Sequence, residues 1–112
     1  MIDLHCHILP GVDDGSPDAE TSLSMARHAA ESGVTAIAVT PHCNLPGFRR
    51  NYRGPDYRRR LNDLRELLTQ ENIPLRLYSG AEVFADPSNI RTLIEQHELI
   101  TLGGSRYLLV EF

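Results

Sequence analysis

Residues 34–40, with the sequence VTAIAVT, constrain the fold of this chain more than any other segment. The segment is a short, continuous apolar run rich in β-branched residues, which is typical of a strand buried on both faces. Strands of this kind belong to parallel sheets whose faces are covered by helices. The segment therefore predicts an α/β fold with a parallel sheet.

Strand-like and helix-like segments alternate along the rest of the chain. Strands are expected over residues 2–7, 34–40, 75–83 and 106–112, and helices over residues 17–32, 56–71 and from 87 onward. The order β-α-β-α-β-α-β implies a parallel sheet with right-handed crossovers. Because a closed eight-stranded barrel needs about 250 residues, this chain of 112 residues is expected to form about half of a barrel.

Polar and proline residues mark the expected helix starts. Ser16 is expected to cap the first helix, with Pro17 at its first helical position and Gly33 at its end. Asp86 and Pro87 repeat this arrangement before the third helix. One face of that helix is expected to include Ile90, Leu93, Ile94 and His97, with His97 as a surface or core-edge residue.

The composition fits one globular domain over residues 1–112, with 41% hydrophobic and 23% charged residues. No apolar run approaches the roughly 20 residues of a membrane-spanning helix, so we expect no membrane insertion. No signal peptide is recognised, and Cys6 and Cys43 form no C-x-x-C pair, so reduced thiols and a cytoplasmic location are expected. A net charge of −4 disfavours binding to nucleic acid.

The segment D-L-H-C-H-I-L-P-G-V-D-D-G, residues 3–15, carries the clearest signal for a functional site. Because side chains alternate along a strand, His5 and His7 project from the same face, with Cα atoms roughly 6.5 to 7 Å apart. Asp14 follows in a loop punctuated by proline and glycine, which can bring its carboxylate back over the same strand end. The alternative is an incidental histidine pair on a half-buried face. The histidine pair alone does not decide between a metal site and an incidental pair, and the rest of the chain favours the metal site.

Residue types that bind metals also lie at the ends of the other three expected strands. In parallel α/β folds, functional side chains collect at the C-terminal ends of the strands. We therefore expect six candidate metal ligands to converge: His5, His7, Asp14, His42, Glu82 and Glu111. Glu82 as a helix cap and Glu111 as a solvated terminal residue are the alternatives. Asp13 is expected to be a turn residue.

The six candidate ligands, three imidazoles and three carboxylates, are more than one tetrahedral ion can bind. Mixed nitrogen and oxygen ligands suit Mn²⁺, Fe²⁺ or Zn²⁺, and two or more ions would use the whole set. Such ions lower the pKa of bound water and stabilise both oxygens of an in-line phosphoryl displacement. The set therefore predicts hydrolysis of a phosphate ester.

A competing motif, H-C-x5-R, spans residues 42–49 and is typical of cysteine-dependent tyrosine phosphatases. That chemistry needs a thiolate at the base of a loop whose backbone N–H groups bind phosphate. Pro46 removes one such donor, and Arg50 stands where a hydroxyl residue is expected. We interpret the match as coincidence. Cys43→Ser is therefore expected to leave turnover nearly intact, and His42→Ala to abolish it.

Six of the eleven basic residues lie within twelve positions: Arg49, Arg50, Arg53, Arg58, Arg59 and Arg60. One interpretation is a solvated loop and helix start. The functional alternative is recognition of phosphate or of an acidic peptide, because the planar guanidinium suits bidentate contacts. Arg49, Arg50 and Arg53 are the candidates for that role.

Residues 3–42 closely resemble the start of the bacterial manganese-dependent protein-tyrosine phosphatases of capsule and exopolysaccharide loci. These enzymes belong to the polymerase-and-histidinol-phosphatase (PHP) superfamily. The resemblance rests on H-x-H-x-L-P-G-x-D-D-G and on T-P-H, which together are far more specific than His-x-His alone. It continues through YSGAEV, residues 78–83, and RYLLVEF, residues 106–112, and so covers essentially the whole chain.

The resemblance implies a distorted seven-stranded, TIM-like barrel of which residues 1–112 are the N-terminal half. It implies a trinuclear manganese centre whose bridging hydroxide attacks phosphotyrosine, with Fe²⁺ or Zn²⁺ as alternatives. All six candidate ligands match ligands of the family, and His42 and Asp14 are the candidate catalytic residues. The implied substrate is the phosphotyrosine tail of a bacterial tyrosine autokinase. Cys43 replaces a histidine frequent in the family, and the family's later ligands and phosphate-binding arginines lie in a second half.

Two other functions remain open. One is a small-molecule phosphatase of the histidinol-phosphate type on the same scaffold, and the other is a barrel fragment that binds metal or protein without turnover. Because a half-barrel presents unpaired strand edges, the chain is expected to form a homo-oligomer or to pair with a complementing subunit. By itself it is expected to bind Mn²⁺ weakly and to hydrolyse little phosphotyrosine.

Overall fold

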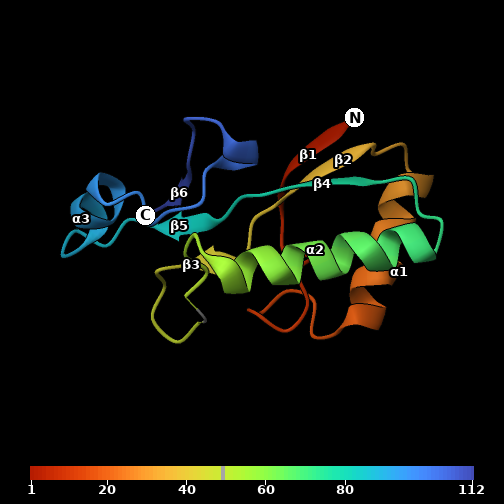
Figure 1. Cartoon of the computed structure of the whole chain (residues 1–112), viewed down its shortest axis with the longest axis horizontal. Coiled ribbons are helices and arrows are strands. Elements are labelled where there is room, and N and C mark those ends of the chain that lie inside the picture. The colour runs from red at the N-terminus through yellow and green to blue at the C-terminus, as the bar shows by residue number, and fades with distance from the viewer. Residues whose placement is uncertain (49) are drawn as a thin grey trace.

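The computed structural model describes residues 1–48 and 50–112, and strands alternate with helices along them (Figure 1). The α/β class predicted from the sequence is therefore confirmed. In chain order the elements are β1 (Ile2–Cys6), α1 (Ala19–Glu31), β2 (Ala36–Val39), β3 (His42–Cys43), α2 (Pro55–Gln70), β4 (Arg76–Tyr78), β5 (Glu82–Phe84), α3 (Ile90–Glu95), the 3₁₀ turn η1 (Leu102–Gly104) and β6 (Leu109–Glu111).

The described strands form two parallel three-stranded sheets, ordered β1-β2-β4 and β3-β5-β6. Every described strand pairing is parallel, as the alternation of strands and helices predicts. In the second sheet, His42 of β3 pairs with Glu82 of β5, and Glu82 pairs with Leu109 of β6. This register sets two candidate ligands beside each other on neighbouring strands.

The sheet is divided where the sequence predicts continuous strand. The structure adds β3 within the expected loop and separates the expected strand 75–83 into β4 and β5. The Tyr57 hydroxyl, from α2, lies 3.2 Å from the Val39 carbonyl oxygen and 2.8 Å from that of Gly80, and it accepts the Gly80 N–H at 3.0 Å. Pro41 has no N–H to donate. The hydrogen bonds between the strands are interrupted at this point because the Tyr57 hydroxyl occupies the backbone groups of Val39 and Gly80.

Helix α1 begins later than predicted, and Ser16 is not its cap. The Asp18 carboxylate accepts the Thr21 N–H at 2.7 Å and is the N-cap. The Ser16 hydroxyl is buried and donates instead to the Asp18 carbonyl oxygen at 2.8 Å, beside the Ser22 hydroxyl at 2.6 Å. Gly33, with a φ of +93°, follows the helix end as expected.

Helix α3 is also shorter than predicted, with only six residues. Asp86 does not start it, because its carboxylate accepts the N–H and the hydroxyl of Ser88 at 2.9 and 2.7 Å and so closes a turn. The helix begins after Asn89. Ile90 and Leu93 pack against the core, but Ile94 of the same expected face is exposed. His97 is exposed, as expected for a surface residue.

The fourth expected strand is confined to β6. The Tyr107 N–H donates to the Ser105 hydroxyl at 3.2 Å, and the Tyr107 carbonyl oxygen accepts the Leu102 N–H at 2.9 Å. These bonds hold residues 102–107 in a turn. The strand therefore starts at Leu109, two residues before the candidate ligand Glu111.

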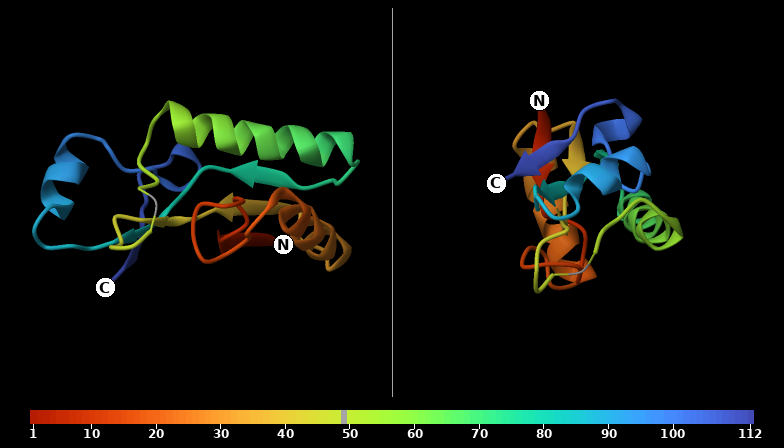
Figure 2. Two further views of the ribbon diagram at one scale, coloured as in Figure 1. Left: turned by 90° about the horizontal axis from the view of Figure 1, so that it is seen from below. Right: turned by 90° about the vertical axis from the view of Figure 1, so that its left-hand side faces the viewer.

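Helices α1 and α2 lie along the β1-β2-β4 sheet, and α3 lies at the other end of the elongated molecule (Figures 1 and 2). All four residues of β2 are buried, and Leu61, Leu64 and Leu68 of α2 belong to the same core. This core fixes the strand ends that carry the candidate ligands. In the part of the chain that the structure describes, no helix is both long and apolar enough to cross a membrane.

Candidate metal centre

The end of β1 places two histidines on the same side of the sheet. His5 lies within β1 and His7 directly follows it. Their Nε2 atoms are 3.1 Å apart, and both face one oxygen of Glu82, Oε1, at 2.9 and 3.0 Å. The three side chains expected to converge, two from the end of β1 and one from β5, therefore do lie together.

His42 connects this group to the remaining candidates. Its Nδ1 atom lies 3.2 Å from Oε1 of Glu111 and 3.7 Å from Oε1 of Glu82. Its Nε2 atom lies 3.4 Å from Oδ1 of Asp14, which comes from the loop after β1. The structure thus brings all six predicted side chains to one place.

The ligand atoms form three overlapping groups, with the atoms of each group within 4.8 Å of one another. The groups are His5, His7 and Glu82; His42, Glu82 and Glu111; and His7, Asp13, Asp14 and His42. His7, His42 and Glu82 each belong to two groups, and shared residues of this kind suit sites that hold more than one cation. A mixed set of imidazoles and carboxylates fits Mn²⁺, Fe²⁺ or Zn²⁺.

The site is arranged to keep its inner carboxylates ionised. Burial opposes ionisation of Glu82, but the hydrogen bond from His5 and the charges of His5, His42 and His7 outweigh it and lower the pKa. Burial likewise opposes ionisation of Asp13, but hydrogen bonds from His7, His42 and Gly15 lower its pKa. Both groups therefore offer negative charge to a cation at neutral pH.

Asp13 has a larger part in the site than the sequence predicts. Its side chain is fully buried, and its Oδ2 atom accepts from His7 Nδ1 and from the His42 N–H, both at 2.9 Å. Its Oδ1 atom accepts the Gly15 N–H at 2.9 Å, which is the expected turn. A Cβ at Gly15 would lie 2.4 Å from His7 Cβ, so glycine is required there. Asp13 fixes the tautomer and ring orientation of His7.

Asp13→Asn is expected to weaken Mn²⁺ binding by about 10- to 100-fold, the usual effect of losing a partner that orients a ligand. Asparagine has the shape of aspartate, but its side-chain NH₂ group cannot accept a hydrogen bond. Either the His42 N–H or the Gly15 N–H therefore loses its acceptor. Isothermal titration with Mn²⁺ measures the effect. Asp63→Asn, on the exposed face of α2, is the matched control. Equal affinities for the two variants would contradict the role of Asp13.

Two further residues hold His42, and no pattern in the sequence pointed to either. The buried Asn51 side chain donates to the His42 carbonyl oxygen at 2.6 Å. The Phe48 ring stacks on the imidazole with centroids 5.0 Å apart and an interplanar angle of 20°. Both come from the loop between β3 and α2, so this loop fixes the position of a candidate ligand.

Cys43 lies next to His42 but points into the core. It is fully buried, and burial raises the pKa of its thiol to about 12. A cysteine nucleophile reacts as the thiolate, which needs a lowered pKa and access to substrate. The geometry therefore opposes the cysteine-dependent chemistry that the H-C-x5-R motif raised as an alternative.

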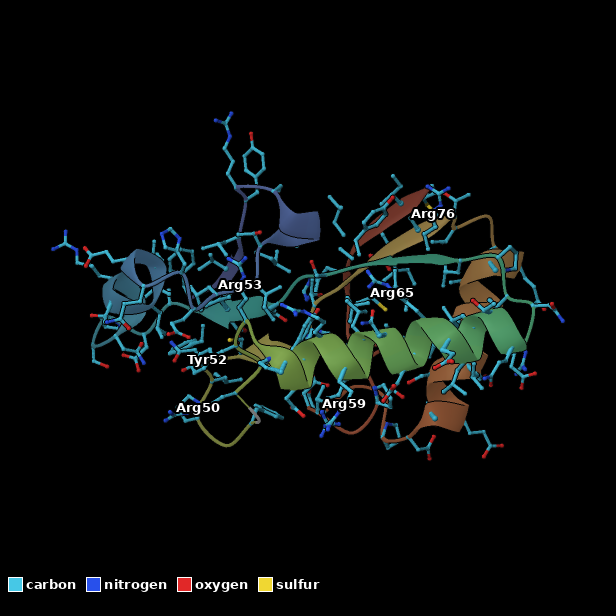
Figure 3. All side chains as sticks on the ribbon, viewed as in Figure 1. Arg50, Tyr52, Arg53, Arg59, Arg65 and Arg76 are labelled. Atoms are coloured by element: carbon cyan, nitrogen blue, oxygen red, sulfur yellow. The ribbon has the colours of Figure 1, made fainter. Side chains whose placement is uncertain are left out.

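The arginines predicted to bind phosphate lie apart from this cluster where the structure describes them. The Arg50 side chain is exposed and points away from the ribbon (Figure 3). Arg53 lines a separate cleft beside α2. Arg49 lies outside the described residues. A role in phosphate binding stays a prediction for all three.

Comparison with known proteins places this geometry in a family. The sequence profile described as capsular polysaccharide synthesis, CpsB/CapC, matches residues 1–112. The chain belongs to the CpsB/CapC family. This CpsB/CapC chain is 37% identical over 112 residues to the tyrosine-protein phosphatase YwqE of Bacillus subtilis, and 34% identical over 114 residues to the tyrosine-protein phosphatase CpsB of Streptococcus pneumoniae.

The fold is also shared with a solved member of the family. The CpsB/CapC chain matches, with a TM-score of 0.89 and 36% identity, a chain from crystal structures of YwqE and CpsB, which are described as metal-dependent tyrosine phosphatases. The match covers all of this chain and 44% of the solved one. The chain likewise spans only 43% and 45% of the YwqE and CpsB sequences.

Proposed function

We propose that this chain is the N-terminal portion of a metal-dependent phosphotyrosine-protein phosphatase that acts in capsule or exopolysaccharide synthesis. The observation that carries the proposal is the convergence of six candidate metal ligands from separate strand ends and one loop. The names of the relatives supply the reaction class. In this proposal, residues 1–112 form about half of a distorted seven-stranded barrel of the PHP type.

The proposed cations are two or three Mn²⁺ ions, with Fe²⁺ or Zn²⁺ as alternatives. His5, His7 and Glu82 would hold one side of the centre, and His42 and Glu111 the other. Divalent cations at such a centre stabilise the charge that develops on a phosphoryl group and lower the pKa of nearby water. Three residues each belong to two of the three ligand groups, and this overlap supports a centre with more than one ion.

Asp14 and His42 are the proposed catalytic pair. The Asp14 side chain is the most exposed of the candidate ligands at 64%, and its carboxylate lies 3.4 Å from His42 Nε2. A substrate therefore meets this pair at the open side of the cluster. We assign to the pair the movement of a proton between water and the tyrosine leaving group, which is a general acid–base role.

The proposed substrate is the phosphotyrosine tail of a bacterial tyrosine autokinase, and the proposed location is the cytoplasm, where such a tail would lie. The resemblance of residues 3–42 to capsule-locus phosphatases supports this choice. The metal chemistry requires only a phosphate ester, so the preference for phosphotyrosine over other phosphate esters has to be measured directly.

Release of phosphate from a phosphotyrosine peptide by the Mn²⁺-loaded chain tests the proposal. Hydrolysis is expected to be slow, because the chain spans under half the length of its relatives. It is expected to stop with EDTA and to return with excess Mn²⁺, and histidinol phosphate is expected to be a poor substrate. Preference for histidinol phosphate would favour a small-molecule phosphatase. Tight Mn²⁺ binding without any phosphate release would mean that the chain binds metal without turnover.

A further inference from the structure

A second candidate site lies between α2 and the segment that runs from α3 to β6. A cleft of about 750 Å³ opens there, within the range of ordinary ligand sites. Its walls carry four arginines: Arg53, Arg58, Arg65 and Arg106. None of the six candidate metal ligands lines it among the described residues, so it is separate from the metal centre.

The cleft concentrates positive charge in a chain whose net charge is −4. Its described lining includes no aspartate or glutamate. On the same helix, Arg59 and Arg60 are paired with Asp56 at 2.6 and 3.2 Å. By contrast, Arg53, Arg58 and Arg106 form no ion pair with any described carboxylate. An anion in the cleft would therefore find guanidinium groups that no acidic side chain of the described residues neutralises.

The arginines that line the cleft come from α2, from the segment just before α2 and from the segment just before β6. Arg58 and Arg65 are seven residues apart on α2 and so lie on one face of the helix. The Arg65 guanidinium is held by two hydrogen bonds to the Leu77 carbonyl oxygen, at 2.7 and 3.2 Å. Figure 3 shows Arg65 on the side of α2 toward β4, and Arg59 on the opposite side. Arg106, from the segment before β6, also lines the cleft, and its guanidinium lies over the Tyr107 ring, 5.8 Å from the ring centroid.

The floor of the cleft is apolar and partly aromatic. The lining includes Tyr57, Leu61, Leu99 and Ile100, all of which are buried. A ligand that matches the whole cleft therefore combines a flat apolar ring with a doubly charged head. Aryl phosphate has this chemistry, since its oxygens suit the planar guanidinium fork and its ring suits the apolar floor.

We propose that this cleft binds a phosphotyrosine of the protein substrate outside the metal centre, as a docking site. The inference rests on the proposed function for its choice of phosphotyrosine over other aryl phosphates. A substrate segment with several phosphotyrosines would then be held at one while another is hydrolysed. Effective concentration at the metal centre rises when a second part of the substrate is bound nearby.

Fluorescence anisotropy with a labelled peptide carrying one phosphotyrosine tests the site directly, in EDTA so that no hydrolysis occurs. The double variant Arg58→Gln, Arg106→Gln is expected to bind at least about tenfold more weakly, because each lost charge-assisted contact has an effect of that order. Arg59→Gln removes one arginine charge from the same helix outside the cleft, and this variant is expected to bind as the unaltered chain does. Both substituted residues are exposed, and circular dichroism checks that the fold is kept.

Three results would overturn the docking site: equal binding by the double variant, equal binding of the unphosphorylated peptide, or competition by inorganic phosphate at the same concentration as the phosphopeptide. The last result would mean a simple anion site. Failure of the proposed function is seen separately, as absence of Mn²⁺-dependent phosphate release from the unaltered chain. The anisotropy measurement does not depend on that reaction.

Discussion

His42→Ala is expected to lower Mn²⁺-dependent phosphotyrosine hydrolysis by about 100-fold or more, whereas Cys43→Ser is expected to leave it nearly unchanged. His42 lies within 3.7 Å of three carboxylates, so its loss removes both a candidate ligand and one member of the proposed catalytic pair. General acid–base groups alone contribute about 10²- to 10⁴-fold. Cys43 is buried with a raised thiol pKa and has no route to substrate. Initial rates with a phosphotyrosine peptide measure both effects.

Cys43→Ser needs a second variant as a control. The serine buries a hydroxyl in an apolar site, and this by itself lowers the stability of the fold. Cys43→Ala avoids this and should retain turnover if the thiol has no chemical role. Loss of hydrolysis in both cysteine variants, with full retention in His42→Ala, would reverse the choice and favour a cysteine nucleophile. Thermal unfolding of each variant separates loss of fold from loss of chemistry.

The convergence of the candidate ligands could be predicted because two geometric rules are local. Alternation along a strand sets His5 and His7 on one face, and parallel strands bring their C-terminal ends to one edge. Neither rule depends on the exact limits of a strand. The prediction that Glu82 meets both histidines therefore held in the structure, although the strand expected to end in it is divided into β4 and β5.

The divisions and helix starts could not be predicted because they depend on partners distant in sequence. The Tyr57 hydroxyl that interrupts the sheet comes from α2, and no pattern within residues 34–43 or 75–83 reveals it. Ser16 is a good N-cap by type, but Ser22 and the Asp18 carbonyl group hold its hydroxyl. Tertiary hydrogen bonds decided these boundaries.

The role of Asp13 within the site could not be predicted either, because it depends on partners distant in sequence. An aspartate before glycine in a short loop is a common turn, and its Oδ1 atom does form one with Gly15. Its second oxygen binds His7 and the His42 backbone, which are 6 and 29 positions away. A doublet of aspartates beside a His-x-His strand is a signal worth testing, because one carboxylate can bind a cation while the other orients the histidine.

Glu82→Gln is expected to weaken Mn²⁺ binding by more than about 100-fold. Glu82 Oε1 lies within 3.0 Å of the Nε2 atoms of His5 and His7, and 3.7 Å from His42 Nδ1. Losing a partner that only orients a ligand weakens binding by about 10- to 100-fold. Loss of a charged oxygen shared by two ligand groups should therefore exceed that range. Isothermal titration or the electron paramagnetic resonance signal of free Mn²⁺ measures the affinity.

Glutamine has the shape of glutamate, so the substitution isolates the charge. Glu95→Gln, on the exposed face of α3, makes the same change away from the cluster and is expected to leave Mn²⁺ affinity unaltered. If the two variants bound Mn²⁺ equally well, the cluster would be a set of hydrogen-bonded side chains and not a metal centre. A loss confined to Glu82→Gln, with the fold kept, would instead tie cation binding to the strand end where the histidines of β1 and β3 meet.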